Sequence, residues 1–146
     1  MASVRASLDG HSIQNHTMNH AWLTDLSNKQ IVDELAPCSS MISYFTHKPT
    51  TLFRPPYGST SNRVEMIGAY LGMRSTMWNV APSKMIFVTP TMVAGVSKQI
   101  SRLATKGVGI VILLHDGSGS RAATVAALPE LIGYLRSLKF EFVKLG

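Results

Sequence analysis

One continuous apolar run, residues 108–114, constrains the fold of this chain more than any other feature. It reads VGIVILL and leads directly into His115 and Asp116. A run without alternation of polar and apolar residues is typical of a strand buried on both faces, as in a parallel sheet covered by helices. We therefore expect a parallel α/β architecture with His115 at the carboxyl end of a buried strand.

Helix and strand signals alternate along the remainder of the chain. Ser27 followed by Gln30 is a capping-box pattern that predicts a helix start, and Pro37 predicts a kink or a division of that helix into two. Further helices are predicted over residues 62–71, 91–106 and 121–138, and strands over residues 51–53, 73–80 and 140–145. This βα alternation predicts one α/β domain over residues 1–146.

Composition limits the size of the core and the classes of partner. At 146 residues and 45% hydrophobic content the chain can bury one core. The net charge of +6 comes from Lys and Arg residues that are spread singly, so we expect no nucleic-acid binding. A mildly basic surface favours an anionic cell-wall polymer, and an ordinary solvated surface explains the charge equally well. No stretch approaches the roughly 18 apolar residues of a membrane helix, so no membrane span is expected.

Cys38 is the one cysteine of the chain, which excludes an internal disulfide. No histidine or acid stands beside it in a recognisable motif. We interpret it as a small, buried or half-buried helix residue rather than as a nucleophile.

A histidine pair lies near the N-terminus, where residues 10–20 read GHSIQNHTMNH. His16 and His20 are four residues apart, and on a helical turn two imidazoles at that spacing share one face and can bind a single divalent cation. Zinc is the metal we expect, although imidazole suits several ions. The alternative is a pair of solvent-facing histidines. Residues 15–17 also match a glycosylation acceptor, which we set aside because a glycan beside a metal ligand would block the site.

Two further motifs follow in order. Residues 54–58 read RPPYG and come after an apolar pair, as a turn follows a strand, and residues 113–115 read LLH. Together with the histidine pair, these motifs resemble those of the NodB-like polysaccharide deacetylases, the family 4 carbohydrate esterases. The resemblance covers residues 4–145 and implies a partial distorted (β/α) barrel, with the site at the carboxyl ends of parallel strands. It also implies metal-dependent removal of acetyl groups from sugar polymers such as chitin or peptidoglycan.

The resemblance assigns roles to particular residues. His16 and His20 would be metal ligands, and Arg54 would orient a catalytic Asp. The backbone N–H of Tyr57 would stabilise the oxyanion, and His115 would protonate the leaving amine. The substrate pocket would include Pro56, Trp78 and Leu113.

Each of these residues also has a plainer interpretation. Arg54 would be a surface salt-bridge partner, and Tyr57 would pack its ring at the turn. His115 would be a strand-end histidine satisfied by Asp116.

The chain also departs from the family pattern. The family's Phe-Asp-Asp-Gly-like motif carries the catalytic base and an acidic metal ligand, and it normally lies several dozen residues before the histidine pair. Asp9-Gly10 does not match that motif, and the Asp-rich motif expected near Trp78 is weak. We therefore expect a deacetylase domain without its N-terminal strand, which holds zinc weakly and has impaired activity. The alternative is a non-catalytic carbohydrate-binding remnant. By resemblance, the location is extracellular or at the cell envelope.

Overall fold

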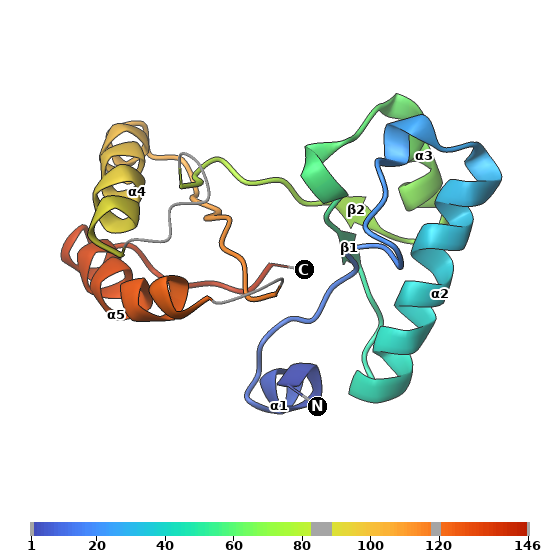
Figure 1. Ribbon diagram of the computed structural model, residues 1–146, viewed down its shortest axis with the longest axis horizontal. Helices are drawn as coiled ribbons and strands as arrows, with labels where there is room; N and C mark the ends of the chain where they lie inside the picture. The colour runs from blue at the N-terminus through green and yellow to red at the C-terminus, as the bar shows by residue number, and fades with distance from the viewer. Residues whose placement is uncertain (1, 83–88, 118–120, 146) are drawn as a thin grey trace. The chain divides into compact units, whose positions relative to one another are not determined.

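A computed structural model describes residues 2–82, 89–117 and 121–145 (Figure 1). For residues 89–92 only the backbone is described. The chain forms two compact units. The N-terminal unit comprises Met1–Met77 with Val143–Gly146, and the C-terminal unit comprises Trp78–Phe142. Each unit is described by itself.

The N-terminal unit is built on short parallel strands. β1 (Leu52–Phe53) pairs in parallel with β2 (Arg74–Ser75), and Leu52 lies opposite Arg74. On the other edge of β1, Asn15 forms a parallel bridge with Phe53, and Arg54 N donates to Asn15 O at 2.9 Å. The predicted strand at residues 51–53 and the predicted parallel arrangement are confirmed.

Helices flank these strands. α1 (Ala2–Leu8) was not predicted, whereas α2 (Asn28–Thr46) and α3 (Asn62–Tyr70) begin where the sequence predicts. Ser27 Oγ accepts from Gln30 N, and the Gln30 side chain accepts from Ser27 N, so the capping box is confirmed. α3 ends before Gly72, whose φ of 77° suits a glycine after a helix. No helix in the described part of the chain is both long and apolar enough to cross a bilayer.

α2 is not divided at Pro37, contrary to one of the predicted outcomes. A proline inside a helix removes the hydrogen bond to the carbonyl four residues earlier, here that of Asp33. Both residues are exposed. Water can therefore satisfy that carbonyl, and the helix continues to Thr46.

The core of the N-terminal unit lies between the strands and the helices. Its buried members are Leu23, Ile31, Leu35, Phe53, Val64 and Met73. Phe53 of β1 lies against Gly68 of α3, where a Cβ atom would overlap the ring. Gly68 therefore allows the helix to approach the strand closely.

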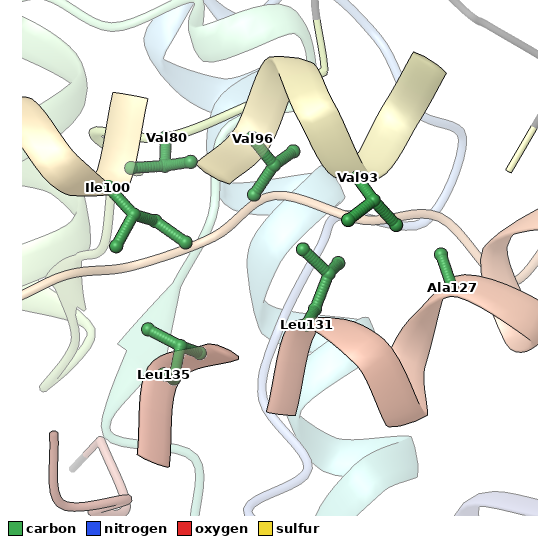
Figure 2. Packing of buried hydrophobic residues seen from close by; sticks show 7 residues of the cluster. All are labelled: Val80, Val93, Val96, Ile100, Ala127, Leu131 and Leu135. Atoms are coloured by element: carbon green, nitrogen blue, oxygen red, sulfur yellow. The ribbon is translucent and has the colours of Figure 1, made fainter. Parts of the chain in front are cut away.

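The C-terminal unit is built on two helices that lie side by side, α4 (Thr89–Ala104) and α5 (Ala122–Ser137). Figure 2 shows the apolar side chains of α4 directed toward those of α5; the buried cluster comprises Val80, Val93, Val96, Ile100, Ala127, Leu131 and Leu135. α5 continues through Pro129, within the helix predicted over residues 121–138. α4 ends two residues before its predicted end, and Gly107, with φ of 63°, follows it.

Three predicted strands are wrong in extent. The run 108–114 contains a single bridge, between Ile112 and Val80, and its side chains are half-buried or exposed rather than buried on both faces. The run 73–80 divides into β2 and the bridge at Val80, and residues 140–145 form no strand. A strand requires hydrogen-bonding partners. Among the described residues, the 108–114 run pairs only with the segment around Val80.

Candidate functional site

The predicted histidine pair comes together in the N-terminal unit. The ring centroids of His16 and His20 are 4.9 Å apart, and the rings are nearly perpendicular. The backbone is not helical, because Thr17 and His20 have φ angles of 68° and 57°, in the left-handed region. The prediction of a helical turn is therefore wrong. Residues in this region cost free energy and cluster at functional sites, where the surrounding structure holds them.

A carbonyl group sets the tautomer of His16. His16 Nδ1 lies 2.6 Å from Arg54 O. A carbonyl oxygen only accepts, so Nδ1 must be the donor, and a neutral ring then carries its lone pair on Nε2. Histidines that bind metals are commonly oriented in this way, with the second ring nitrogen donating to a carbonyl or a carboxylate.

Glu34 of α2 holds the loop between the two histidines. Its carboxylate accepts from Asn19 N at 2.8 Å and from Asn19 Nδ2 at 2.7 Å, and its side chain is buried. Burial by itself raises the pKa of this carboxyl, but hydrogen bonds from Asn19, Thr17 and Met18 outweigh burial and lower the pKa below its ordinary value. Glu34 is thus a buried carboxylate that fixes the backbone directly before His20.

Glu34 is not among the site residues predicted from the sequence. Its signal was available, because Glu34 is three residues after Ile31 and directly precedes Leu35, on the apolar stripe of α2. A carboxylate on a buried helix face is rare unless it has partners.

Asn15 supports the same loop from the sheet side. Its Oδ1 accepts from Thr17 N at 2.8 Å, and its Nδ2 donates to Leu35 O and Ser39 Oγ, both at 2.7 Å. The residue is 1% exposed. Thr17 Oγ1 in turn accepts from His20 N at 3.1 Å. The side chains of Asn15 and Thr17 therefore fix the backbone at Thr17, which has a left-handed conformation, and at His20.

The RPPYG turn lies beside the histidine pair. Arg54 is half-buried, its Nε donates to Thr76 O at 3.3 Å, and burial lowers the pKa of its guanidinium. The ion pairs among the described residues are Arg5–Asp9 and Lys29–Asp33, and neither includes Arg54.

Tyr57 has a left-handed backbone with φ of 60°. The hydrogen bonds of its turn come from the N–H groups of Gly58 and Ser59, and the preceding Pro56 is buried.

Tyr57 also belongs to a row of four rings, which we call the ring row: His16, His20, Tyr57 and Trp22. Tyr57 contacts His20 with centroids 4.8 Å apart, and it stacks on Trp22 with centroids 4.2 Å apart and planes 7° apart. Trp22 lies two residues after the second histidine and is not among the site residues predicted from the sequence.

The remaining predicted site residues belong to the C-terminal unit. Leu113 is half-buried, and its N–H donates to Val80 O at 2.9 Å. His115 is exposed two residues later, and Trp78 is half-buried at the start of the unit. Their roles beside the histidine pair stay predictions. In the part of the chain that the structure describes, no three His, Cys, Asp or Glu residues gather as a metal site would require.

Cys38 lies half-buried on α2, as predicted. Burial raises the pKa of its thiol, the negative charge of Glu34 raises it further, and a hydrogen bond from the His16 backbone only partly offsets both effects. The thiol therefore stays protonated at neutral pH, in agreement with the interpretation that Cys38 is not a nucleophile.

Two relatives are similar to this chain in sequence. A peptidoglycan-N-acetylglucosamine deacetylase from Bacillus cereus is 27% identical over 135 residues, which cover 92% of this chain and 62% of the relative. A chitin deacetylase from Amylomyces rouxii is 28% identical over 137 residues, which cover 89% of this chain and 32% of the relative.

A solved structure shares the fold. It is a family 4 carbohydrate esterase from Streptomyces lividans in complex with acetate, with a TM-score of 0.77 and 31% identity over 92% of this chain and 66% of that one. This likeness confirms the predicted fold class, a partial barrel of the polysaccharide deacetylase type. The chain spans at most 66% of the length of these three proteins. Residues 3–76, half of the chain, match the family described as polysaccharide deacetylase. The chain therefore belongs to the polysaccharide deacetylase family.

Proposed function

We propose that the chain contributes the histidine side of a metal-dependent site that removes acetyl groups from polysaccharides. The observation that carries this proposal is the pairing of His16 with His20, together with the hydrogen bond that sets the His16 tautomer. Membership of the family supports the same chemistry.

The donor set suits a zinc-type ion. His16 and His20 supply two imidazoles, and such sites take a third protein ligand that is often a carboxylate. That carboxylate is not found near the pair among the described residues. When bound, the metal would polarise the acetyl carbonyl and lower the pKa of a water molecule. We therefore propose weak metal binding and impaired activity unless an acidic group from outside the described residues completes the site.

The remaining side chains would act on the acetyl group and on the leaving group. The backbone N–H of Tyr57, held in its left-handed turn, would donate to the oxygen that becomes negative during the reaction. The Arg54 guanidinium would hold an acidic residue in place. His115 would protonate the departing nitrogen, and Leu113, Pro56 and Trp78 would line the pocket.

The proposed substrate is a polymer of N-acetylglucosamine. Relatives are named as deacetylases of peptidoglycan and chitin, and a third is named as a bifunctional xylanase/xylan deacetylase. O-acetylated polysaccharide is therefore the alternative substrate. Action on such polymers would place the protein outside the cell or at the cell envelope.

Metal titration tests the site directly. We expect weak binding of Zn²⁺ or Co²⁺ by calorimetry, and at least about tenfold weaker binding in His16→Ala and in His20→Ala. His11→Ala is the matched control, because His11 is an exposed histidine of the same unit outside the ring row. Equal affinity in all three variants would contradict the proposal.

Acetate release from N-acetylglucosamine oligomers tests the activity. Turnover that disappears with chelator and in His16→Ala would support the deacetylase and overturn the expected impairment. Oligomer binding without acetate release at saturating metal would favour the non-catalytic alternative.

A further inference from the structure

The ring row ends in two exposed aromatic side chains, and none of the roles above uses their rings. Trp22 and Tyr57 are stacked almost in parallel, and they are 51% and 54% exposed. Single exposed apolar residues are common and need no explanation. A stacked pair next to a candidate metal ligand is different, because it presents a flat apolar surface at the edge of the site.

Polar contacts hold the segment that carries Trp22 against the turn that carries Tyr57. Thr24, two residues after Trp22, donates its N–H to Ser59 Oγ at 3.2 Å, and the two hydroxyl oxygens lie 2.7 Å apart. Arg63 Nη2 donates to Thr24 O at 3.0 Å. Ser59 follows Tyr57 by two residues and is buried.

A second anchor is apolar. Leu23, directly after Trp22, is fully buried in the core. Both backbones beside the aromatic pair are therefore fixed, so a ligand would bind to the pair without having to order it first.

Tyr57 contacts two rings of the row, Trp22 and His20, whereas Trp22 contacts only Tyr57 within the row. Trp22 is therefore the terminal ring, and about half of its surface is exposed. The indole ring of Trp22 carries no charge, so its exposed surface suits a neutral, flat, partly apolar ligand.

We propose that Trp22, braced by Tyr57, is a sugar-stacking subsite that binds a neutral N-acetylglucosamine ring of the polymer next to the unit whose acetyl group meets the histidine pair. This inference rests on the proposed function for its substrate class. The C–H face of a pyranose ring is flat and apolar, and ligand sites combine such aromatic surfaces with a few polar groups. Tyr57 links the two roles, because its ring braces Trp22 and its backbone lies at the site.

Oligomer binding in the presence of chelator tests this subsite without metal or turnover. With a tetramer of N-acetylglucosamine, we expect Trp22→Ala to weaken binding by about tenfold in calorimetry and Trp22→Phe by less, because a large aromatic anchor carries much of the affinity of such a contact. Tyr70→Ala is the control, since Tyr70 is an 86% exposed aromatic residue of the same unit. The change in tryptophan fluorescence on binding should be lost in Trp22→Phe.

Three outcomes would overturn the subsite: no saturable binding by the parent chain, equal affinity in Trp22→Ala and Tyr70→Ala, or tighter Trp22-dependent binding of the cationic glucosamine tetramer. The last would point to cation–π recognition of an amine. Absence of zinc binding by the parent chain, together with intact Trp22-dependent oligomer binding, would contradict the proposed function and leave the subsite standing.

Discussion

The two units of this chain keep their residues in place by different means. All four buried polar side chains of the described residues, Ser7, Asn15, Glu34 and Ser59, belong to the N-terminal unit. The C-terminal unit is held by an apolar contact between α4 and α5 (Figure 2). The N-terminal unit also contains the left-handed residues Thr17, His20 and Tyr57. In this chain, buried hydrogen bonds therefore position the histidine pair, whereas apolar packing holds the α4–α5 helix pair together.

The largest expected effect tests the apolar half of this comparison. Leu131→Ala should destabilise the C-terminal unit by about 2–5 kcal/mol, because it leaves a cavity between α4 and α5. Urea unfolding followed by circular dichroism measures the loss. Val125→Ala on the same helix is the control, since Val125 is 64% exposed, and it should change stability by less than about 0.5 kcal/mol.

Zinc affinity of the folded Leu131→Ala variant sharpens the result. We expect it to equal that of the parent chain. If zinc affinity fell as well, the packing of α4 against α5 would contribute to positioning the histidine pair, and the contrast between the two units would not hold.

The next effect tests the polar half. Glu34→Gln should cost about 2 kcal/mol of stability, because the amide loses charge-assisted hydrogen bonds and turns donors toward the donors of Asn19. Because Glu34 fixes the loop before His20, zinc affinity should also fall by about tenfold. Calorimetry and urea unfolding measure both quantities.

Asp33→Asn is the matched control for Glu34. Asp33 is the preceding residue of α2 and forms an exposed pair with Lys29. Its loss should change stability by no more than about 0.5 kcal/mol and leave zinc binding unchanged. If the two variants behaved alike, the buried carboxylate would not position the loop.

Acidification provides a smaller, graded test of the same carboxylate. The pKa of Glu34 is lower in the folded chain than its ordinary value. Its contribution to stability is therefore fully present above the unfolded-state pKa and is lost as the pH falls through the folded-state pKa. The difference in unfolding free energy between the parent chain and Glu34→Gln should narrow from about pH 7 to about pH 3. A difference independent of pH would show that Glu34 does not act through its charge.

The smallest expected effect concerns the reactivity of the Cys38 thiol, which accepts a hydrogen bond from the His16 backbone. Because burial raises the pKa of Cys38, alkylation by iodoacetamide near neutral pH should be at least about tenfold slower in the folded chain than in urea. Mass spectrometry at timed intervals measures both rates. Equal rates would mean that α2 opens at this position, and the rigid support inferred for the loop would not exist.

Helix ends were predictable from the sequence because their signals are local. The Ser27–Gln30 capping box and the glycines after α3 and α4 each act within one turn of the chain. Strands were predicted poorly, because a strand needs partners from distant segments. The run 108–114 is apolar enough for a central strand, yet only the segment around Val80 pairs with it among the described residues.

The candidate site was predictable in part for the same reason. The motifs at residues 16–20 and 54–57 are in contact, since Arg54 O accepts a hydrogen bond from His16 Nδ1. The conformation of the histidine loop was not predictable from spacing, because it depends on Glu34, which lies beyond the loop in sequence and reaches it through the tertiary fold. Trp22 was missed because stacking on Tyr57 likewise joins residues that are distant in sequence.

The burial of Asn15 has a practical consequence for producing this chain. Its amide nitrogen is occupied by two acceptors and is enclosed by the fold, although residues 15–17 spell an acceptor for N-linked sugar. An enzyme of a eukaryotic secretory pathway could modify this asparagine only before folding, and the attached sugar would then prevent the amide from entering its pocket. Secretion from yeast or insect cells should accordingly yield a glycosylated fraction that fails to fold, whereas expression in the bacterial cytoplasm should not.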